Sequence, residues 1–143
     1  MPMKLLVAWY GLVQTAHIIV IVRALIILLV SGSLSFPALP PAGGWSAQAQ
    51  HFLIATGAID AVNAVLSLIF VRGYFTRARW ARWLGTMNLT ASIYSALLFA
   101  YGTIASGAWA GGNLVGYLAM TIVFVPVIIL FIVHSMQAMK GGY

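Results

Sequence analysis

Apolar side chains dominate four long stretches of the chain, which run approximately from 5 to 30, 52 to 71, 83 to 104 and 114 to 136. Each stretch is long enough to cross a bilayer, since a spanning helix needs about 20 predominantly apolar residues. The pattern therefore predicts an all-α integral membrane protein in which residues 1–143 form one domain of four transmembrane helices.

The connections between the stretches indicate how the helices are arranged. Segment 31–50 contains Pro37, Pro40, Pro41 and the pair Gly43-Gly44, a composition that breaks helices and favours an exposed loop. The other two connections are short, and a short connection makes the flanking helices antiparallel neighbours. We therefore expect an up-down-up-down four-helix bundle. We do not expect the first stretch to be a cleavable signal peptide, because it is too long and contains Arg23.

Basic residues outside the stretches predict the orientation in the membrane. They are Lys4, Arg72, Arg77, Arg79, Arg82 and Lys140. The positive-inside rule places all of them on the cytoplasmic side. One topology satisfies every position, with both termini and the second connection in the cytoplasm. The expected location is the inner (cell) membrane, as a multi-pass protein.

The second connection mixes arginine with aromatic residues, which is typical of a contact with lipid headgroups. We assign the role of membrane-interface anchor to Arg72, Arg77, Arg79, Trp80, Arg82 and Trp83. Nucleic-acid binding is not expected, because a short segment pressed against a bilayer offers no platform for bases.

Composition excludes several classes of protein. The chain is 63% hydrophobic and 6% charged, whereas soluble domains carry about 25% charged residues. It has one acid, three histidines and no cysteine, so ligands for a zinc or di-iron site are scarce. Accordingly, the sequence predicts neither a catalytic residue nor a metal site.

Two ionisable residues lie deep in the predicted spans. With a helical rise of ~1.5 Å per residue, Arg23 lies roughly 12 Å and Asp60 roughly 13 Å from the outer ends of adjacent antiparallel helices. The matching depths predict an intramembrane ion pair between Arg23 and Asp60, because pairing offsets part of the desolvation cost of both charges. Two alternatives are a pair that only fixes helix register, and an Arg23 side chain that extends to the outer headgroups.

Polar residues recur on one face of the second and third spans. Thr56, Asp60, Asn63 and Ser67 are spaced four, three and four residues apart, which places them on one helical face. Such a seam can be helix-packing contacts, or it can line a narrow cavity. The residues of the predicted seam, which include candidates from the first and third spans, are Gln14, His17, Thr56, Asn63, Asn88, Ser92 and Tyr94.

The first span carries polar residues on two opposite sides. Gln14 and His17 share a face, whereas Arg23 follows Gln14 by nine residues and, at ~100° per residue, lies on the opposite side. One small bundle cannot easily bury both sides, which indicates partner proteins in the membrane. The main functional hypothesis is therefore an accessory subunit of a larger energy-transducing (respiratory or photosynthetic) membrane complex, which contributes helix packing and assembly rather than catalysis.

The alternative, from another class, is a bundle that binds or transports a lipophile or a cation in a polar intramembrane cavity. An enzyme ranks third, because only Asp60 and His17 could supply an acid or a base. No cofactor is required. His17 could ligate a pigment as a single axial histidine, whereas a bis-histidine haem does not fit the unequal depths of the histidines. A hydrogen bond from His17 to Asn63 or Asn88 competes with pigment ligation.

Overall fold

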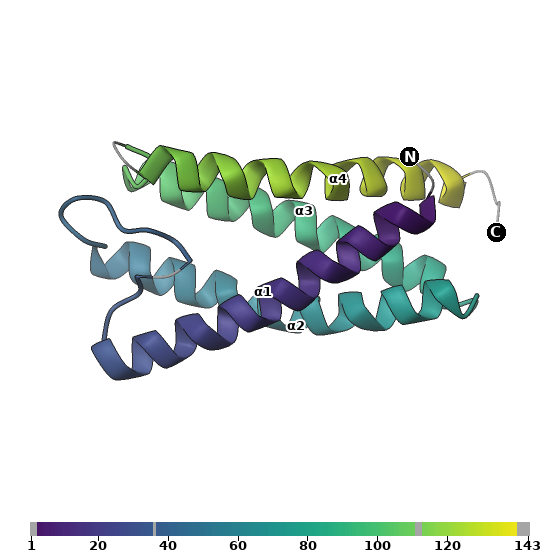
Figure 1. Ribbon diagram of the computed structural model, residues 1–143, viewed down its shortest axis with the longest axis horizontal. Helices are drawn as coiled ribbons and strands as arrows, with labels where there is room; N and C mark the ends of the chain where they lie inside the picture. The colour runs from purple at the N-terminus through teal and green to yellow at the C-terminus, as the bar shows by residue number, and fades with distance from the viewer. Residues whose placement is uncertain (1–2, 36, 111–112, 140–143) are drawn as a thin grey trace.

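The computed structural model describes residues 3–35, 37–110 and 113–139. These residues form four helices and no strand: α1 (Met3–Ser31), α2 (Ala47–Phe75), α3 (Ala81–Ala105) and α4 (Leu114–Met139) (Figure 1). The all-α prediction is confirmed. Helices α1, α2 and α4 are long and apolar enough to cross a membrane, which indicates a multi-pass membrane protein. The expected span within α3 stays a prediction, and Lys140 lies outside the described residues.

Helix α2 extends beyond its apolar stretch at both ends. It begins at Ala47 rather than near residue 52, because the Ser46 hydroxyl caps the helix and accepts a hydrogen bond from Ala49 N at 3.2 Å. At the other end, Arg77 adopts a left-handed φ of 56° and Ala78 N donates to the Gly73 carbonyl at 2.8 Å. This is a Schellman motif, in which the turn satisfies the last helical carbonyls.

The helices form a closed ring of neighbours, in which α1 contacts α2, α2 contacts α3, α3 contacts α4, and α4 contacts α1. Consecutive helices run in opposite directions (Figure 1). The start of α1, the α2–α3 turn and the end of α4 share one end of the molecule, which we call the basic end; the opposite one is the loop end. Helix α1 is oblique, because it lies beside α4 at the basic end and away from α4 at the loop end (Figure 1).

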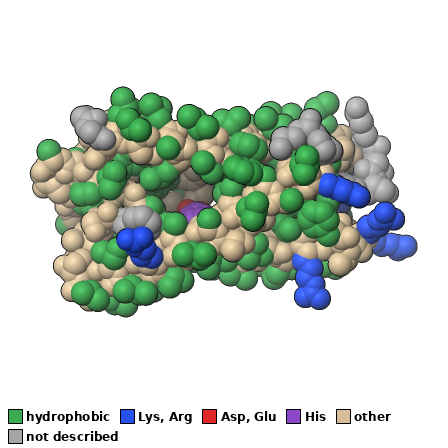
Figure 2. All heavy atoms as spheres, viewed as in Figure 1, with side chains coloured by type: hydrophobic (Ala, Val, Ile, Leu, Met, Phe, Trp, Pro, Cys, Tyr) green, Lys and Arg blue, Asp and Glu red, His purple; other side chains and the backbone are tan. Residues whose placement is uncertain are grey.

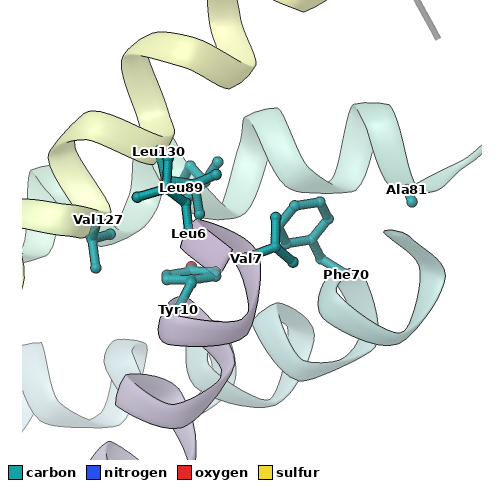
Figure 3. Close-up of a cluster of buried hydrophobic side chains, with 8 residues drawn as sticks. All are labelled: Leu6, Val7, Tyr10, Phe70, Ala81, Leu89, Val127 and Leu130. Carbon is teal, nitrogen blue, oxygen red and sulfur yellow. The ribbon is translucent and has the colours of Figure 1, made fainter. Parts of the chain in front are cut away.

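All four helices meet in a hydrophobic core at the basic end (Figure 3). Its buried residues are Leu6, Val7, Tyr10, Phe70, Ala81, Leu89, Val127 and Leu130. Packing is close, because a Cβ atom on Gly85 would overlap the Phe70 ring and lie 2.9 Å from His134. The first and last helices are therefore held together at this end.

A smaller core at the loop end holds the connection between α1 and α2 in place. Leu34 and Ala38 from this connection are buried with Ala24 of α1 and Leu53 of α2. Helix α4 also binds the connection, because the Tyr117 hydroxyl donates to the Leu39 carbonyl at 2.8 Å. The connection thus links α1 and α2 to α4 across the end of the bundle.

Candidate ligand-binding site

Between the two cores, the divergence of α1 from α4 leaves a cavity of about 830 Å³, which we call the lateral groove. Its lining side chains come from within residues 9–20 of α1, 92–100 of α3 and 117–128 of α4, with Pro37, Asp60, Asn63 and Trp109. Figure 2 looks into this hollow, where a histidine and the only acid of the chain, Asp60, are visible at the floor. The volume falls within the ~300–1,000 Å³ typical of small-molecule sites.

A second cavity of about 290 Å³ lies between α1 and α2 toward the loop end. It shares five lining residues with the lateral groove, so the two cavities adjoin along His17, Val20, Pro37, Asp60 and Phe99. His17 is the central residue of α1, and Asp60 lies near the centre of α2. The ionisable residues that the cavities share are therefore at mid-length of the bundle, and the shared wall continues to Pro37 toward the loop end.

A closed ring of hydrogen bonds forms the boundary of the lateral groove toward the basic end. The Ser67 hydroxyl donates to the Asn63 carbonyl at 2.7 Å, so it can only accept in its 2.7 Å contact with the Tyr10 hydroxyl. Because Tyr10 thereby uses its one proton, Ser92 must donate to Tyr10 at 2.7 Å, and Ser92 in turn accepts from Asn63 Nδ2 at 2.9 Å. This Tyr10 ring joins α1, α2 and α3, and each of its hydroxyls donates once and accepts once.

Two polar atoms that line the lateral groove have no hydrogen-bond partner among the described residues. They are Gln14 Oε1 and Ser95 Oγ, on residues that are 2% and 8% exposed. Asn88 Nδ2 and Trp45 Nε1 are also unpartnered, but these residues do not line the groove. Since buried polar groups are normally hydrogen-bonded, the free atoms of Gln14 and Ser95 are available to a bound molecule.

The structure does not bring Arg23 and Asp60 together. Asp60 lines both cavities, whereas Arg23 lines neither and its side chain is exposed. No ion pair joins the two residues in the part of the chain that the structure describes, and Arg23 has an interaction of its own. The expected pair is therefore corrected. Asp60 lies at mid-length with His17, whereas Arg23 follows His17 by six residues toward the loop end. In addition, Gln14 and His17 occupy the inward face of α1, and Arg23 lies on the opposite side.

Most residues of the predicted seam line one of the two cavities, one is buried outside both cavities, and one is exposed. Gln14, His17, Asn63 and Ser92 line the lateral groove, and Thr56 lines the smaller cavity. Asn88 is 3% exposed and lines neither cavity. Tyr94 is 64% exposed on the outer face of α3, so its expected place in a cavity is corrected. Tyr94 follows Ser92 by two residues, and a rotation of ~200° directs it away from the seam.

The cavity does not lie directly between α2 and α3. Close packing fills that space, because a Cβ atom on Gly102 would lie 2.5 Å from the Phe52 ring. The hydrogen bond from Asn63 to Ser92 also crosses this contact, and Asn63 does not donate to His17. The seam therefore packs the two helices together and, on the side of α1 and α4, presents its polar groups to the groove.

Five of the six assigned interface anchors are exposed at the basic end: Arg72, Arg77, Arg79, Trp80 and Trp83. Arg82 differs, because its Nη2 donates to the Ala138 carbonyl at 2.6 Å in the last turn of α4. A cation is favourable there, since the C-terminus of a helix carries partial negative charge. Arg82 therefore joins α3 to α4, in addition to any contact with headgroups.

Sequence reasoning did not identify Tyr10 or the aromatic side chains at the loop end of the groove. The missed signal for Tyr10 is its position four residues before Gln14, on the same face of α1. The aromatic wall consists of Phe99, Trp109 and Tyr117. The rings of Trp109 and Tyr117 stack with centroids 5.1 Å apart, and those of Phe99 and Tyr117 are 6.3 Å apart.

No family model, curated protein or solved structure matches the chain. Within the described ranges, no group of three His, Asp or Glu side chains could hold a metal ion.

Proposed function

We propose that the protein spans the membrane with all four helices, as an up-down-up-down bundle, and binds a lipophilic small molecule in the lateral groove. For α3, the distribution of its side chains supports this proposal. Its polar residues Asn88, Ser92 and Ser95 are at most 8% exposed, whereas Leu97 and Ile104 are 64% and 56% exposed. A helix with buried polar groups and exposed apolar side chains suits a lipid environment.

The observation that carries the binding function is the chemistry of the groove. Its walls are mostly apolar, and its floor holds the unpartnered atoms of Gln14 and Ser95 beside Asp60 and His17. Small-molecule sites have this composition, in which apolar walls bind the body of a ligand and a few polar groups orient it. The expected ligand therefore has an apolar body and one polar head.

Access to the groove is sideways, between α1 and α4. Leu12, Met120 and Val123 on the lining are 66%, 37% and 46% exposed, so the opening is bordered by apolar side chains. Toward the loop end, Pro37 contributes to the walls of both cavities, and the adjacent Ala38 is 1% exposed. A ligand would therefore approach from the acyl chains of the bilayer.

Photolabelling tests this function directly. The full chain in lipid nanodiscs is illuminated with a diazirine analogue of 4-hexylbenzyl alcohol, and labelled peptides are identified by mass spectrometry. We expect labelling within residues 9–20 and 117–128 that excess unlabelled alcohol prevents. A groove-filling variant, Ala96→Phe, should lose this labelling because Ala96 lines the groove.

The matched control is Ala105→Phe, the same substitution at an exposed position of α3 that does not line the groove. It should keep the labelling of the normal chain. Labelling spread evenly over lipid-facing residues, without competition by the alcohol, would contradict the proposal. Extraction of the purified protein, followed by mass spectrometry and absorption spectroscopy, would identify any native lipophile, including a pigment bound at His17.

For orientation, we propose that the basic end faces the cytoplasm at the inner membrane. The exposed residues Lys4, Arg72, Arg77 and Arg79 all lie at this end. The positive-inside rule supports this orientation, since cytoplasmic segments carry the excess of lysine and arginine. Both ends of the chain would then be cytoplasmic.

A second candidate is the accessory subunit of an energy-transducing membrane complex. It is supported by the outer half of α1, where Leu29 and Val30 are 76% and 83% exposed. A partner helix would cover these side chains. Native purification in mild detergent distinguishes the candidates, because a subunit should co-purify with other chains, whereas a binding protein should be recovered alone with its lipophile.

A further inference from the structure

Asp60 determines the charge that the lateral groove favours. It is the only acid of the chain, and it lines both cavities. None of the side chains that line either cavity belongs to lysine or arginine, and Arg23 is not among them. A carboxylate among apolar groups is costly unless a cation or a proton neutralises it. Among the described residues, no ion pair within 4.0 Å joins Asp60 to Arg23 or His17, although His17 lines the same two cavities and interacts electrostatically with Asp60.

Hydrogen-bonding capacity favours a head group that donates. The Asp60 carboxylate and Gln14 Oε1 can only accept hydrogen bonds, and the Ser95 hydroxyl can accept as well as donate. Gln14 Oε1 and Ser95 Oγ are both unpartnered, and their residues line the same groove as Asp60. The hydroxyls of the Tyr10 ring cannot supply the missing donors, because each hydroxyl proton is already used; the Asn63 amide keeps one N–H beyond the one it donates to Ser92.

The aromatic wall adds a third feature with the same preference. Phe99, Trp109 and Tyr117 line the groove on its loop-end side, and Phe99 also lines the smaller cavity with Asp60. The faces of aromatic rings attract cations, most strongly where water is excluded. Such a wall binds the apolar body of a ligand and tolerates a positive charge beside it.

From these three features, we infer that the groove is selective for lipophilic ammonium ions, with the protonated amine on Asp60 and Gln14 and the apolar body along the aromatic wall. This inference rests on the proposed binding function and specifies its ligand class. A primary ammonium carries three N–H donors, as many as the acceptors that Asp60, Gln14 and Ser95 present to the groove. A neutral alcohol of the same shape has one proton to donate and no charge.

The test compares two probes of equal size, 4-hexylbenzylamine and 4-hexylbenzyl alcohol. Binding to the full chain is measured by isothermal titration calorimetry in nanodiscs of zwitterionic lipid, with empty nanodiscs as background. We expect the amine to bind at least about tenfold more tightly than the alcohol, because a charge-assisted hydrogen bond contributes more than a neutral one. Asp60→Asn should weaken the amine to the level of the alcohol and leave alcohol binding within about twofold.

Asp60→Glu keeps the charge and should keep the preference for the amine, so it supports the inference even where Asp60→Asn fails to fold. Tyr94→Phe, on the outer face of α3, is the control and should alter neither probe. If both probes fail to bind the normal chain, the proposed function fails. If the alcohol binds and the amine shows no preference, or if Asp60→Asn leaves the preference intact, the ammonium inference alone is overturned.

Discussion

Tyr10→Phe removes the tyrosine hydroxyl, which is the central group of the hydrogen-bonded Tyr10 ring, and preserves the shape of the side chain. Tyr10 is fully buried in the core of the basic end, so phenylalanine should retain its packing. The substitution deletes the two short hydrogen bonds between helices, one donated to Ser67 and one accepted from Ser92, together with the long 3.5 Å contact from the hydroxyl to the Asn88 carbonyl. The bond between Asn63 and Ser92 and that between Ser67 and the Asn63 carbonyl remain.

The expected loss of stability follows from the groups that stay behind. Ser67 loses only the hydrogen bond that it accepts from Tyr10. The Ser92 hydroxyl can rotate and donate instead to the carbonyl of Asn88, four residues earlier in its own helix. No unsatisfied proton is left, so the loss is that of two interhelical bonds. Such bonds in membrane proteins contribute about 0.6 kcal/mol on average and up to about 1.7 kcal/mol each, so Tyr10→Phe should cost about 1–3 kcal/mol.

Unfolding by sodium dodecyl sulfate in mixed micelles, followed by circular dichroism, measures this free energy. Ser92→Ala breaks the same ring, so the double variant should cost less than the sum of the two single variants. Tyr94→Phe provides the control, because Tyr94 is exposed. The closed ring would be refuted by a Tyr10→Phe variant within about 0.3 kcal/mol of the normal chain, or by strictly additive effects of Tyr10→Phe and Ser92→Ala.

Three further outcomes are expected. Gly85→Ala should destabilise the bundle by about 1–3 kcal/mol in the same unfolding assay, because its Cβ atom would overlap the Phe70 ring. Gly57→Ala should not destabilise it, because a Cβ atom there meets no atom within 4 Å. Equal effects of the two substitutions would contradict this packing. Arg82→Gln should lower the free energy of unfolding by about 1.5–3 kcal/mol, because it removes the charged hydrogen bond to α4. Arg79→Gln, at an exposed position, should leave this free energy unchanged. Similar losses in the two variants would contradict the role of Arg82 in joining α3 to α4. A reporter fused to the C-terminus should read cytoplasmic and one inserted near Gly43 should read external, and the opposite result would reverse the orientation.

The long apolar stretches predicted the existence of the helices well, and their ends less well. An apolar stretch is a local property of the sequence, and all four helices contain their predicted stretches. The start of α2 differs because Ser46 caps the helix, which begins at Ala47, five residues before the apolar stretch. Polar residues near the ends can therefore be helical, and hydropathy alone cannot identify them.

The candidate site shows what depth along a helix can and cannot predict. Depth along a helix follows from counting residues, but an ion pair also requires both side chains to lie at one level of the folded bundle and to face each other. Asp60 lies at mid-length with His17, whereas Arg23 follows His17 by six residues toward the loop end. The opposite faces of Gln14 and Arg23 already argued against such a pair. The divergence of α1 from α4 creates the groove, and it follows from tertiary packing: α1 and α4 share the core at the basic end, and the connection bound by Tyr117 lies at the other end. No spacing within one helix specifies such a tilt.

The contact between α1 and α4 imposes an order on biosynthesis. About 80 residues separate the end of α1 from the start of α4, so at ~5–20 residues per second the ribosome needs ~4–16 s to supply the second wall of the groove. Gln14 and His17 are therefore synthesised well before the cavity that they line can form, although α2, which carries Asp60, follows α1 directly. Until α4 is inserted, the nascent chain presents these polar groups to the translocation machinery or to lipid, and the groove is complete only when the last helix joins the first.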